Sequence, residues 1–254
     1  MPRIPQVKLE PLRQLGSRLL DLLYPPLCEL CGDGLGNGRA LCGACMEDLP
    51  RLQMPFCKSC GEAFEGEIEG DFACPNCATL EFSFEFARSA LVRDPRTLDL
   101  IHRLKYGREV YLATELGRLG AEAFDDPRLA PALSGKWPLL PVPLHRKRQQ
   151  ARHFNQAQEL ARAISKHVDL PLLNALLRHR STETQTLLSR RQRLENLRGA
   201  FSLGKQGRSW VKKFPAGAIL IDDVLTTGST VDECAKTLRR GGFQKVIVVT
   251  IMRG

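Results

Sequence analysis

The sequence predicts an α/β protein in which a parallel sheet is flanked by helices and preceded by a cysteine-rich segment. Apolar, mostly β-branched or leucine-rich runs at 137–144, 216–221 and 245–252 have the length and composition of buried strands, and helical patterns follow the first two. Four Cys-x-x-Cys pairs occur before residue 80. The 254-residue chain is 43% hydrophobic and 26% charged, which is the composition of a globular protein with a core.

The net charge of +9 favours polyanionic partners such as nucleic acid, phosphates or an acidic membrane face. No apolar run approaches the roughly 18 residues that a membrane span needs. Charged residues interrupt the N-terminal segment 1–27, which excludes the apolar core of a signal peptide, and its leucines have helical spacing. We therefore expect an N-terminal extension with a short amphipathic helix in a cytoplasmic protein, where disulfides seldom persist.

The cysteine-rich segment spans residues 28–80 and is predicted to bind two zinc ions. Two Cys-x-x-Cys turns close a tetrahedral shell of four thiolates. The segment has few large apolar residues and many glycines, so the metal would supply much of its folding energy. These features predict a double zinc ribbon. Its ligands would be Cys28, Cys31, Cys42, Cys45, Cys57, Cys60, Cys74 and Cys77.

Two other interpretations of these cysteines are disfavoured. A cytosolic chain argues against a disulfide framework, and a redox motif needs a thioredoxin-like context that this sequence lacks. Sequential pairing of the cysteine pairs into two sites is preferred, with an interleaved pairing as the alternative. The ninth cysteine, Cys234, falls in a predicted helix and is expected to be a small core residue.

The remaining residues, 81–254, form the predicted α/β domain. A strand is expected at 82–92, where phenylalanines alternate with smaller residues. Two helices at 97–104 and 110–124 and a proline-containing loop at 125–135 follow. The first buried strand leads through a basic loop to a helix at 155–167, and the second leads to a helix at 230–240.

The stretch from Ala218 to Glu233, AILIDDVLTTGSTVDE, is the strongest candidate for a binding site. Asp222 and Asp223 follow a buried strand, and the carboxyl ends of parallel strands face the ligand crevice. The next residues of the motif combine hydroxyl groups, one glycine and the unpaired N–H groups of a helix N-terminus, which together suit a phosphate. This phosphate cradle comprises Thr226, Thr227, Gly228, Ser229 and Thr230.

A ribose 5-phosphate matches this arrangement, with its phosphate in the turn and its diol on the two aspartates. Mg²⁺ would be held through the diol and a second phosphate. The alternative is that the hydroxyls only cap the helix and that the aspartates are solvated, but a cap accounts for only one hydroxyl. The chain contains neither a Walker phosphate loop nor a dinucleotide-binding glycine fingerprint after a strand.

Residues 219–230, ILIDDVLTTGST, resemble the phosphoribosyl pyrophosphate (PRPP) signature of type I phosphoribosyltransferases. Four further segments and the cysteine-rich N-terminus are similar to the ComF/GntX-like competence family of that superfamily. These segments are IHRLKYGRE (101–109), PVPLHRKR (141–148), RHFNQAQELA (152–161) and RSTETQTLLSRRQRLENLRGAF (180–201). The resemblance covers residues 24–254 and implies a type I phosphoribosyltransferase-like sheet, PRPP binding with Mg²⁺ and a link to DNA uptake in natural transformation. One departure is His153, where the family has glycine, so His153 needs another way to make a tight turn.

The basic residues are assigned partly by this resemblance, which places pyrophosphate at the loop after the first buried strand. The candidates there are Arg146, Arg148 and Arg152, with Lys105 as a weaker candidate. A solvated basic loop is the alternative. The arginine-rich segment 178–198 resembles a mobile hood over the substrate, and a DNA-facing surface is the competing interpretation.

Two functions therefore remain open from the sequence. The first is a PRPP-dependent phosphoribosyltransferase, whose aspartates would catalyse by stabilising a sugar cation and whose acceptor the sequence does not identify. The second is a non-catalytic adaptor of the competence machinery that binds single-stranded DNA and other competence proteins through zinc ribbons and basic patches. Few aromatic residues lie among the arginines, which leaves the second hypothesis without a visible stacking platform.

Overall fold

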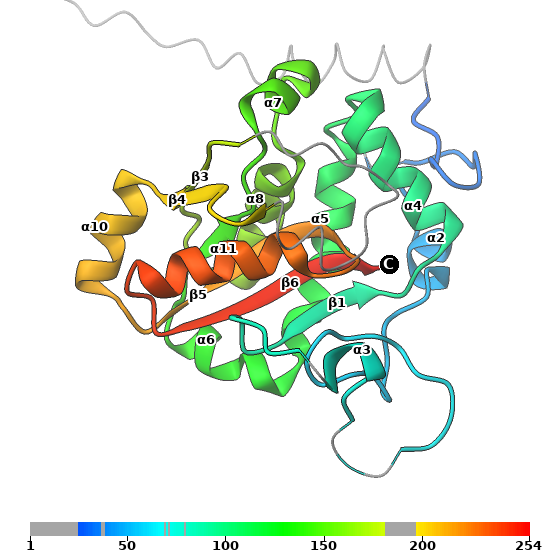
Figure 1. Cartoon of the computed structure of the whole chain (residues 1–254). Coiled ribbons are helices and arrows are strands. Elements are labelled where there is room, and N and C mark those ends of the chain that lie inside the picture. Colours follow the sequence, from blue (N-terminus) through cyan, green and yellow to red (C-terminus); the bar gives the residue numbers. More distant parts are fainter. Residues whose placement is uncertain (1–24, 37–38, 69, 71, 79, 181–196) are drawn as a thin grey trace, which may run out of the picture. The chain divides into compact units, whose positions relative to one another are not determined.

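Figure 1 shows the protein as a computed structural model, which describes residues 25–36, 39–68, 70, 72–78, 80–180 and 197–254. The predicted N-terminal amphipathic helix and most of the arginine-rich segment 178–198 lie outside the described residues. The chain divides into two compact units, Met1–Asp48 and Leu49–Gly254. Among the described residues, no helix combines the length and apolar character that crossing a membrane requires.

The first unit is built around one cysteine cluster. A turn at Cys28–Asp33 is closed by a hydrogen bond from Cys28 N–H to Asp33 O, and Gly32 takes the positive φ of 77° that this turn needs. Helix α2, Gly43–Asp48, follows. Among the described residues of this unit, Leu41 and Met46 are buried apolar side chains. Together with the cysteines they form its small core.

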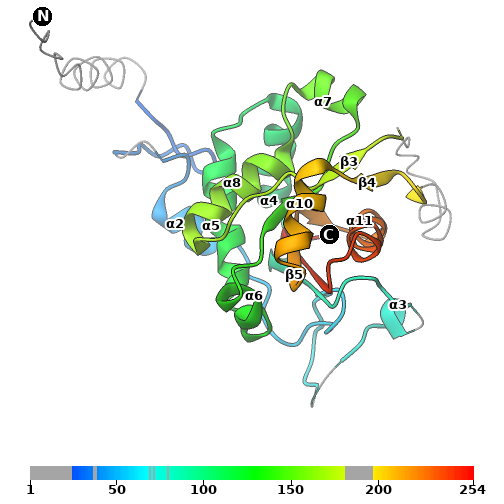
Figure 2. The same cartoon turned by 90° about the vertical axis from the view of Figure 1, so that its left-hand side faces the viewer.

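The second unit contains a four-stranded, fully parallel sheet in the order β1-β6-β5-β2. The strands are β1 Ala87–Leu91, β2 Leu139–Pro141, β5 Gly217–Leu225 and β6 Lys245–Arg253. Helices α5, Leu112–Glu122, and α8, Gln156–Val168, cover one face, and α11, Ser229–Arg240, covers the other (Figure 2). The predicted parallel α/β sheet flanked by helices is confirmed.

The central strands β5 and β6 are buried almost throughout, which explains their continuous apolar runs. Leu220 pairs with Val248, and both are fully buried. Ser89 Oγ and Thr250 Oγ1 form a buried hydrogen bond of 2.7 Å between β1 and β6, which satisfies two hydroxyls inside the sheet. The predicted core residue Cys234 is fully buried against this sheet on α11, as expected.

Several elements differ from the sequence expectations. The strand expected at 82–92 begins only at Ala87, and Phe82 and Phe84 instead stack with ring centroids 4.5 Å apart. The strand expected at 216–221 continues to Leu225, so Asp222 and Asp223 lie within β5. The reason is that β6 continues alongside it and pairs Thr250 with Asp222.

The loop expected at 125–135 is wrong, because this segment is helical. It contains η2 Ala123–Asp125, η3 Pro127–Leu129 and α6 Ala130–Ser134. Pro127 and Pro131 each lie in the first turn of a helix, where the backbone N–H that proline lacks would have no partner within the helix. Asp126 also caps η3 by accepting from the Arg128 N–H.

The basic segment after β2 is a helix rather than a loop. Helix α7, Arg146–Arg152, begins at His145, whose Nδ1 accepts from the Lys147 N–H. It ends at His153, which takes a left-handed conformation with φ 68°. His153 therefore makes the same tight turn that glycine would make, and histidine is one of the residue types that tolerate this region.

The other described elements complete the unit. They are α3 Pro75–Ala78, α4 Pro95–His102, the π-helix η1 Arg103–Gly107, β3 Leu176–Arg178, β4 Phe201–Leu203 and α10 Lys205–Lys213. β3 and β4 form a separate antiparallel pair. Neither this pair nor α10 was predicted from the sequence.

Candidate functional site

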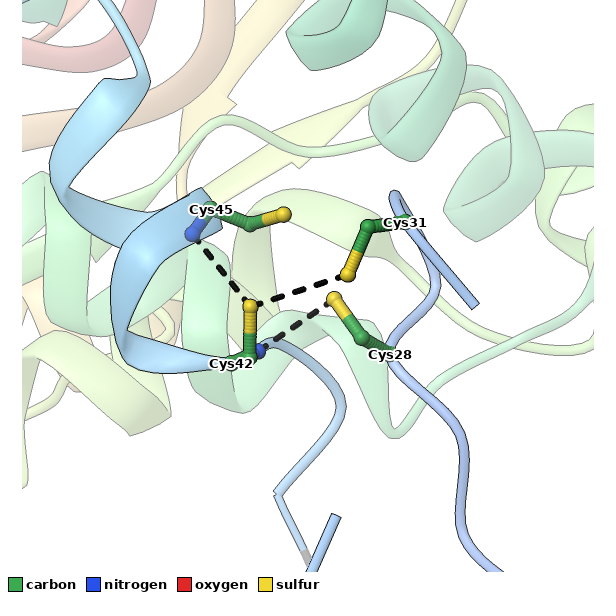
Figure 3. Close-up of side chains that lie close together, drawn as sticks. All are labelled: Cys28, Cys31, Cys42 and Cys45. Atoms are coloured by element: carbon green, nitrogen blue, oxygen red, sulfur yellow. Dashed lines mark hydrogen bonds between the residues drawn. The ribbon is translucent and has the colours of Figure 1, made fainter. Parts of the chain in front are cut away.

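The first unit holds a cluster of four cysteines, Cys28, Cys31, Cys42 and Cys45, whose thiol groups point toward one another (Figure 3). Their four sulfur atoms lie within 4.8 Å of one another, and the Sγ atoms of Cys31 and Cys42 are 3.8 Å apart. The Cys42 N–H donates to Cys28 Sγ at 3.3 Å. Burial alone would raise the pKa of Cys28, but this and neighbouring backbone N–H groups lower it to about 6.

The second unit holds a matching cluster of four buried cysteines, Cys57, Cys60, Cys74 and Cys77. The Sγ atoms of Cys60 and Cys74 are 3.7 Å apart, and the Cys74 N–H donates to Cys57 Sγ at 3.3 Å. Burial opposes ionisation of Cys57, yet backbone N–H groups lower its pKa to about 7. The same N–H to sulfur bond thus recurs at equivalent positions of both clusters.

Both clusters fit Zn²⁺. Tetrahedral coordination with Zn–S bonds of about 2.3 Å places the sulfur atoms about 3.8 Å apart. The observed separations of 3.8 and 3.7 Å match this value. Sequential pairing of the Cys-x-x-Cys turns is confirmed, since Cys28 to Cys45 form one cluster and Cys57 to Cys77 form the other.

Strand β5 presents Asp222 and Asp223 to opposite faces of the sheet, because successive side chains of a strand alternate. Asp223 is 4% exposed; its Oδ1 accepts from Gln156 Nε2 at 3.2 Å, and its other oxygen pairs with Lys105 Nζ. Asp222 continues the row of side chains that faces α11, where Arg178 and Cys234 act on it electrostatically. The two carboxyl groups nevertheless lie within hydrogen-bond reach of each other, and the Lys105 ammonium acts on both.

The pKa values of the two aspartates move in opposite directions. Burial raises the pKa of Asp222 well above its ordinary value, and the negative charge of Asp223 raises it further. Burial also acts on Asp223, but the Lys105 ammonium outweighs it and lowers the pKa of that carboxyl. When the pair carries one proton, that proton therefore resides on Asp222 rather than on Asp223.

Lys105 reaches Asp223 from the π-helix η1, a rare element that often marks functional sites. The neighbouring Tyr106 ring stacks under the Arg152 guanidinium at 4.8 Å, and Arg152 Nη1 donates to Gln156 Oε1 at 2.8 Å. Gln156 is therefore held by Arg152 on one side while it donates to Asp223 on the other. This network joins η1, the end of α7, the start of α8 and strand β5.

The predicted phosphate cradle forms the turn between β5 and α11. Gly228 has φ 76° and caps α11, so the glycine is required by the backbone. Thr227 Oγ1 lies 3.0 Å from Ser229 Oγ and accepts from the Ser229 N–H at 3.4 Å. Thr226 is exposed, Thr230 is half-buried and Ser229 is buried, so the turn offers hydroxyls at graded depths.

The structure brings some of the predicted basic residues to the acidic pair. Lys105 contacts Asp223 directly, and Arg152 reaches it through Gln156. Arg148 on α7 lies near Arg178, which in turn lies near Asp222. Arg146 is exposed and, within the described part of the chain, forms no hydrogen bond or ion pair with the acidic pair.

Sequence reasoning missed several residues that organise the site. Gln156 is brought to Asp223 by tertiary structure, and so is Arg178 of the predicted arginine-rich segment to Asp222. Asp232 and Glu233 are buried near the start of α11, where they accept from the Ser83 and Gly199 N–H groups at 2.7 Å each. Acidic residues at the start of a helix can be recognised in a sequence as favourable to the helix dipole. The distant N–H groups that they bind cannot be recognised there.

Comparison with known proteins identifies the family. Residues 19–78 match the model of the double zinc ribbon domain, which confirms that prediction. Two solved structures are similar at low TM-scores. The first is an allosteric regulatory enzyme of purine biosynthesis, with a TM-score of 0.32 and 16% identity, covering 55% of this chain and 26% of that chain. The second is orotate phosphoribosyltransferase from Aeropyrum pernix, with a TM-score of 0.30 and 15% identity, covering 65% of this chain and 80% of that chain.

Curated relatives match over most of their length. Competence protein F of Haemophilus influenzae is 32% identical over 218 residues, covering 84% of this chain and 90% of that protein. DNA utilization protein YhgH of Escherichia coli (strain K12) is 33% identical over 238 residues, covering 91% and 99%. The YhgH protein of Salmonella typhimurium is 30% identical over 236 residues, with the same coverage. The chain therefore belongs to the competence family that includes competence protein F and DNA utilization protein YhgH.

Proposed function

We propose that the protein binds PRPP, or another ligand containing ribose 5-phosphate, together with Mg²⁺, and transfers the phosphoribosyl group to an acceptor. One observation carries this proposal. The hydroxyl-rich turn Thr226–Thr230 directly follows the acidic pair on β5, and basic side chains from η1 and β3 come to the same pair. The arrangement combines an anion cradle, hydrogen-bond acceptors for a diol and cations for a second phosphate.

The 5-phosphate would occupy the turn between β5 and α11. The N–H groups at the start of a twelve-residue helix and its dipole favour an anion there. Thr227 and Ser229 already lie within hydrogen-bond distance of each other, so their hydroxyls are positioned to donate to the same phosphate. Gly228 lets the backbone come close to the ligand.

The sugar diol would bind the carboxylates, and the pyrophosphate would face Lys105, Arg148 and Arg178. Guanidinium groups suit phosphate because they donate two parallel hydrogen bonds. Mg²⁺ would neutralise charge on the pyrophosphate as it departs. Lys105 would then exchange part of its interaction with Asp223 for the ligand.

In the transfer step, the bond between the anomeric carbon and the pyrophosphate oxygen breaks, and its electron pair leaves with pyrophosphate. Positive charge develops on the sugar, and the ionised carboxylate of Asp223 would stabilise it electrostatically. A nucleophilic atom of the acceptor then forms the new bond to that carbon. The acceptor class is left open by the described residues.

The names of the relatives, competence protein F and DNA utilization protein, support a role of this chain in DNA uptake during natural transformation. We propose that it acts there beside other competence proteins. The phosphosugar site would then give the uptake machinery a ligand-dependent component.

Calorimetry with PRPP and Mg²⁺ on the zinc-loaded protein tests the binding proposal. Wild type should bind one PRPP per chain, and Asp223→Asn should weaken binding by about a hundredfold because a charged hydrogen-bond acceptor is lost. The matched control is Asp99→Asn, an aspartate on α4 whose side chain is 61% exposed. Absence of PRPP binding by folded wild type would refute the proposal.

A second candidate function, binding of single-stranded DNA, is favoured by helix α10. This helix carries four basic residues and no acidic one, and Trp210 and Phe214 line a cavity of about 380 Å³ beside it. The Phe214 side chain is 57% exposed, with its ring centroid 5.1 Å from that of Trp210. This surface supplies the aromatic platform that the sequence did not reveal.

Fluorescence anisotropy with a single-stranded oligonucleotide tests the second candidate. Phe214→Ala should weaken binding by at least about tenfold, which is the effect of removing one stacked base. Lys213→Gln should lower the salt slope by about one. Affinity that is independent of both residues and of salt would argue against a DNA-binding surface at α10.

A further inference from the structure

The buried side chain of Arg253 lies between the second cysteine cluster and the proposed phosphate cradle. Arg253 ends strand β6 and is 9% exposed. Its Nη1 donates to Leu225 O at 2.7 Å and to Thr226 O at 3.1 Å. These carbonyls belong to the last residue of β5 and the first residue of the cradle, so Arg253 holds the backbone where the strand turns into the cradle.

The other end of the same guanidinium reaches the cluster. Arg253 Nη2 donates to Cys60 Sγ at 3.8 Å and forms an ion pair with the Glu62 carboxylate. Cys60 is one of the four buried sulfur ligands of that cluster. One planar side chain therefore connects a zinc-ligating sulfur to the carbonyls that begin the cradle.

Main-chain bonds fix the cluster against the sheet at the same place. The Ala87 N–H donates to Ser59 O at 2.9 Å, which ties the Cys57–Cys60 turn to the start of β1. A side chain at Gly61 would approach Ala87 O to 3.1 Å, so the turn lies close against the strand. The cluster is thus a rigid support on which the Arg253 side chain can act.

We propose that Arg253 is a positioning residue that makes the geometry of the Thr226–Thr230 cradle depend on the metal in the second cysteine cluster. Arginine stays protonated in proteins, so a buried guanidinium needs negative partners. Zn²⁺ would hold the Cys60 sulfur as such a partner, fixed in a tetrahedral shell within reach of Arg253 Nη2. Without the metal, this sulfur is no longer held in place against the guanidinium.

Displacement of the Cys60 sulfur leaves Arg253 with Glu62, whose side chain is 43% exposed, and with main-chain carbonyls, including that of Gly254. The guanidinium then turns toward Glu62 and water and releases the carbonyls of Leu225 and Thr226. The cradle and the first turn of α11 open locally, while the central sheet keeps its hydrogen bonds. The cluster thus acts on the site as well as on the stability of the fold.

Hydrogen–deuterium exchange on the full chain tests this coupling through residues 226–233, which include the Asp232 N–H bonded to Gly228 O. Arg253→Lys keeps the charge and loses the planar fork. It should retain two zinc ions per chain and raise exchange at 226–233 by about tenfold, because charge-assisted bonds to two carbonyls are lost. Unchanged exchange in a folded Arg253→Lys protein overturns the proposal.

Arg128→Lys is the matched control. Arg128 Nη1 donates to Lys58 O at 2.9 Å, so this arginine also joins the second cluster region to the body of the unit. Its partners Lys58 and Asp126 do not belong to the cradle. Exchange at 226–233 should stay within about twofold of wild type, since local exchange follows local opening. An equal rise in both variants would mean that Arg253 is only a structural support and would overturn the proposal.

A second measurement leaves Arg253 intact, so it remains decisive even if Arg253→Lys does not fold. Cys28 and Cys31 are both changed to Ser, which confines metal to the second cluster, and a chelator then removes it. Protection at 226–233 should fall in step with zinc release while 217–221 stay protected. Loss of protection across the whole sheet, or none at 226–233, overturns the proposal.

Calorimetry adds a binding readout that rests on the proposed function. PRPP with Mg²⁺ should bind Arg253→Lys about tenfold more weakly than wild type and Arg128→Lys equally well, since only the former loses bonds at the cradle. If wild type binds no PRPP, the proposed function fails while the exchange result still decides the role of Arg253. If PRPP binds wild type and Arg253→Lys alike, the positioning role is overturned.

Discussion

At Asp222 and Asp223, the pKa values of neighbouring residues of one strand shift in opposite directions because their carboxyl groups have different surroundings. Asp223 contacts Lys105 and Gln156, which favour its ionised form, whereas burial and the negative charge of Asp223 disfavour ionisation of Asp222. Such an arrangement stores unfavourable electrostatic energy in the free protein. Functional sites often accept this cost because a ligand later relieves it.

We expect Asp222→Asn to stabilise the protein. The pKa of Asp222 is raised in the folded state, so the folded protein binds more protons than the unfolded chain above the ordinary aspartate pKa, and stability falls as pH rises. Asparagine cannot ionise and avoids this loss. The free energy of unfolding in urea should exceed that of wild type by on the order of 1 kcal/mol at pH 8, with a smaller gain at pH 6.

The comparison variant is Asp223→Asn. It leaves the Lys105 ammonium without its buried carboxylate, so it should destabilise the protein by about 3 kcal/mol. Equal effects of the two substitutions, in either direction, would contradict the opposite pKa shifts of the two carboxyl groups.

The sequence identified the aspartates because they interrupt an apolar run, which is a local signal. It gave Lys105 only a weak role, because its pairing with Asp223 is made by the fold between distant parts of the chain. Gln156 lies in a segment that resembles the family but received no role, and Arg253 was not singled out. An amide at the start of a helix and an arginine at the end of a strand are common, and their significance comes only from their partners.

At the scale of elements, α5 and α8 are neighbours on one face of the sheet, and their closest approach is at Gly117. A Cβ on Gly117 would overlap the Cβ of Ala163 on α8. The glycine therefore sets the distance between the helices, and with it the place of α8. The start of α8 carries Gln156 to Asp223, so this packing supports the site.

We expect Gly117→Ala to destabilise the protein by about 1–2 kcal/mol, because overpacking outweighs the gain in helix propensity. Adding Ala163→Gly should remove the overlap and return the double variant close to wild type. Urea denaturation of the two single variants and the double variant gives the coupling energy. Additive effects would show that the helices do not meet at these residues.

Helical periodicity predicted α5, α8 and α11 because each buries one apolar face. It failed at α7, which has no buried residue, and at α10, where basic residues surround the only large apolar side chains. The π-helix η1 was also not predicted, because a single widened turn does not change the spacing of apolar residues along the sequence enough to be recognised. These elements are polar and carry or flank the candidate binding surfaces, which explains why pattern reasoning missed them.

At the scale of the whole molecule, the two cysteine clusters belong to different compact units. The first lies in Met1–Asp48 and the second in Leu49–Gly254, together with the α/β sheet. Similar motifs therefore have unequal consequences for the sheet. The second cluster shares a unit with the sheet, where Arg253 of β6 contacts Cys60.

We expect Cys74→Ser to lower the melting temperature of the second unit by about 5–10 °C, because a structural zinc site contributes folding free energy. The chain's two tryptophans, Trp137 and Trp210, both lie in this unit and report its unfolding by fluorescence. Cys42→Ser in the first cluster is the matched control and should leave this transition unchanged. Equal shifts would show that the clusters stabilise the chain as one cooperative unit.

The raised pKa of Asp222 has a thermodynamic consequence for any ligand of this site. Below that pKa, a cation or diol that requires both carboxylates ionised must expel a proton into the solvent. The buffer that captures this proton adds its own heat of protonation, so the apparent enthalpy of association should differ between Tris and PIPES at one pH while the dissociation constant stays the same. Affinity should also rise with pH and become constant once the pH exceeds the pKa of Asp222 in the free protein.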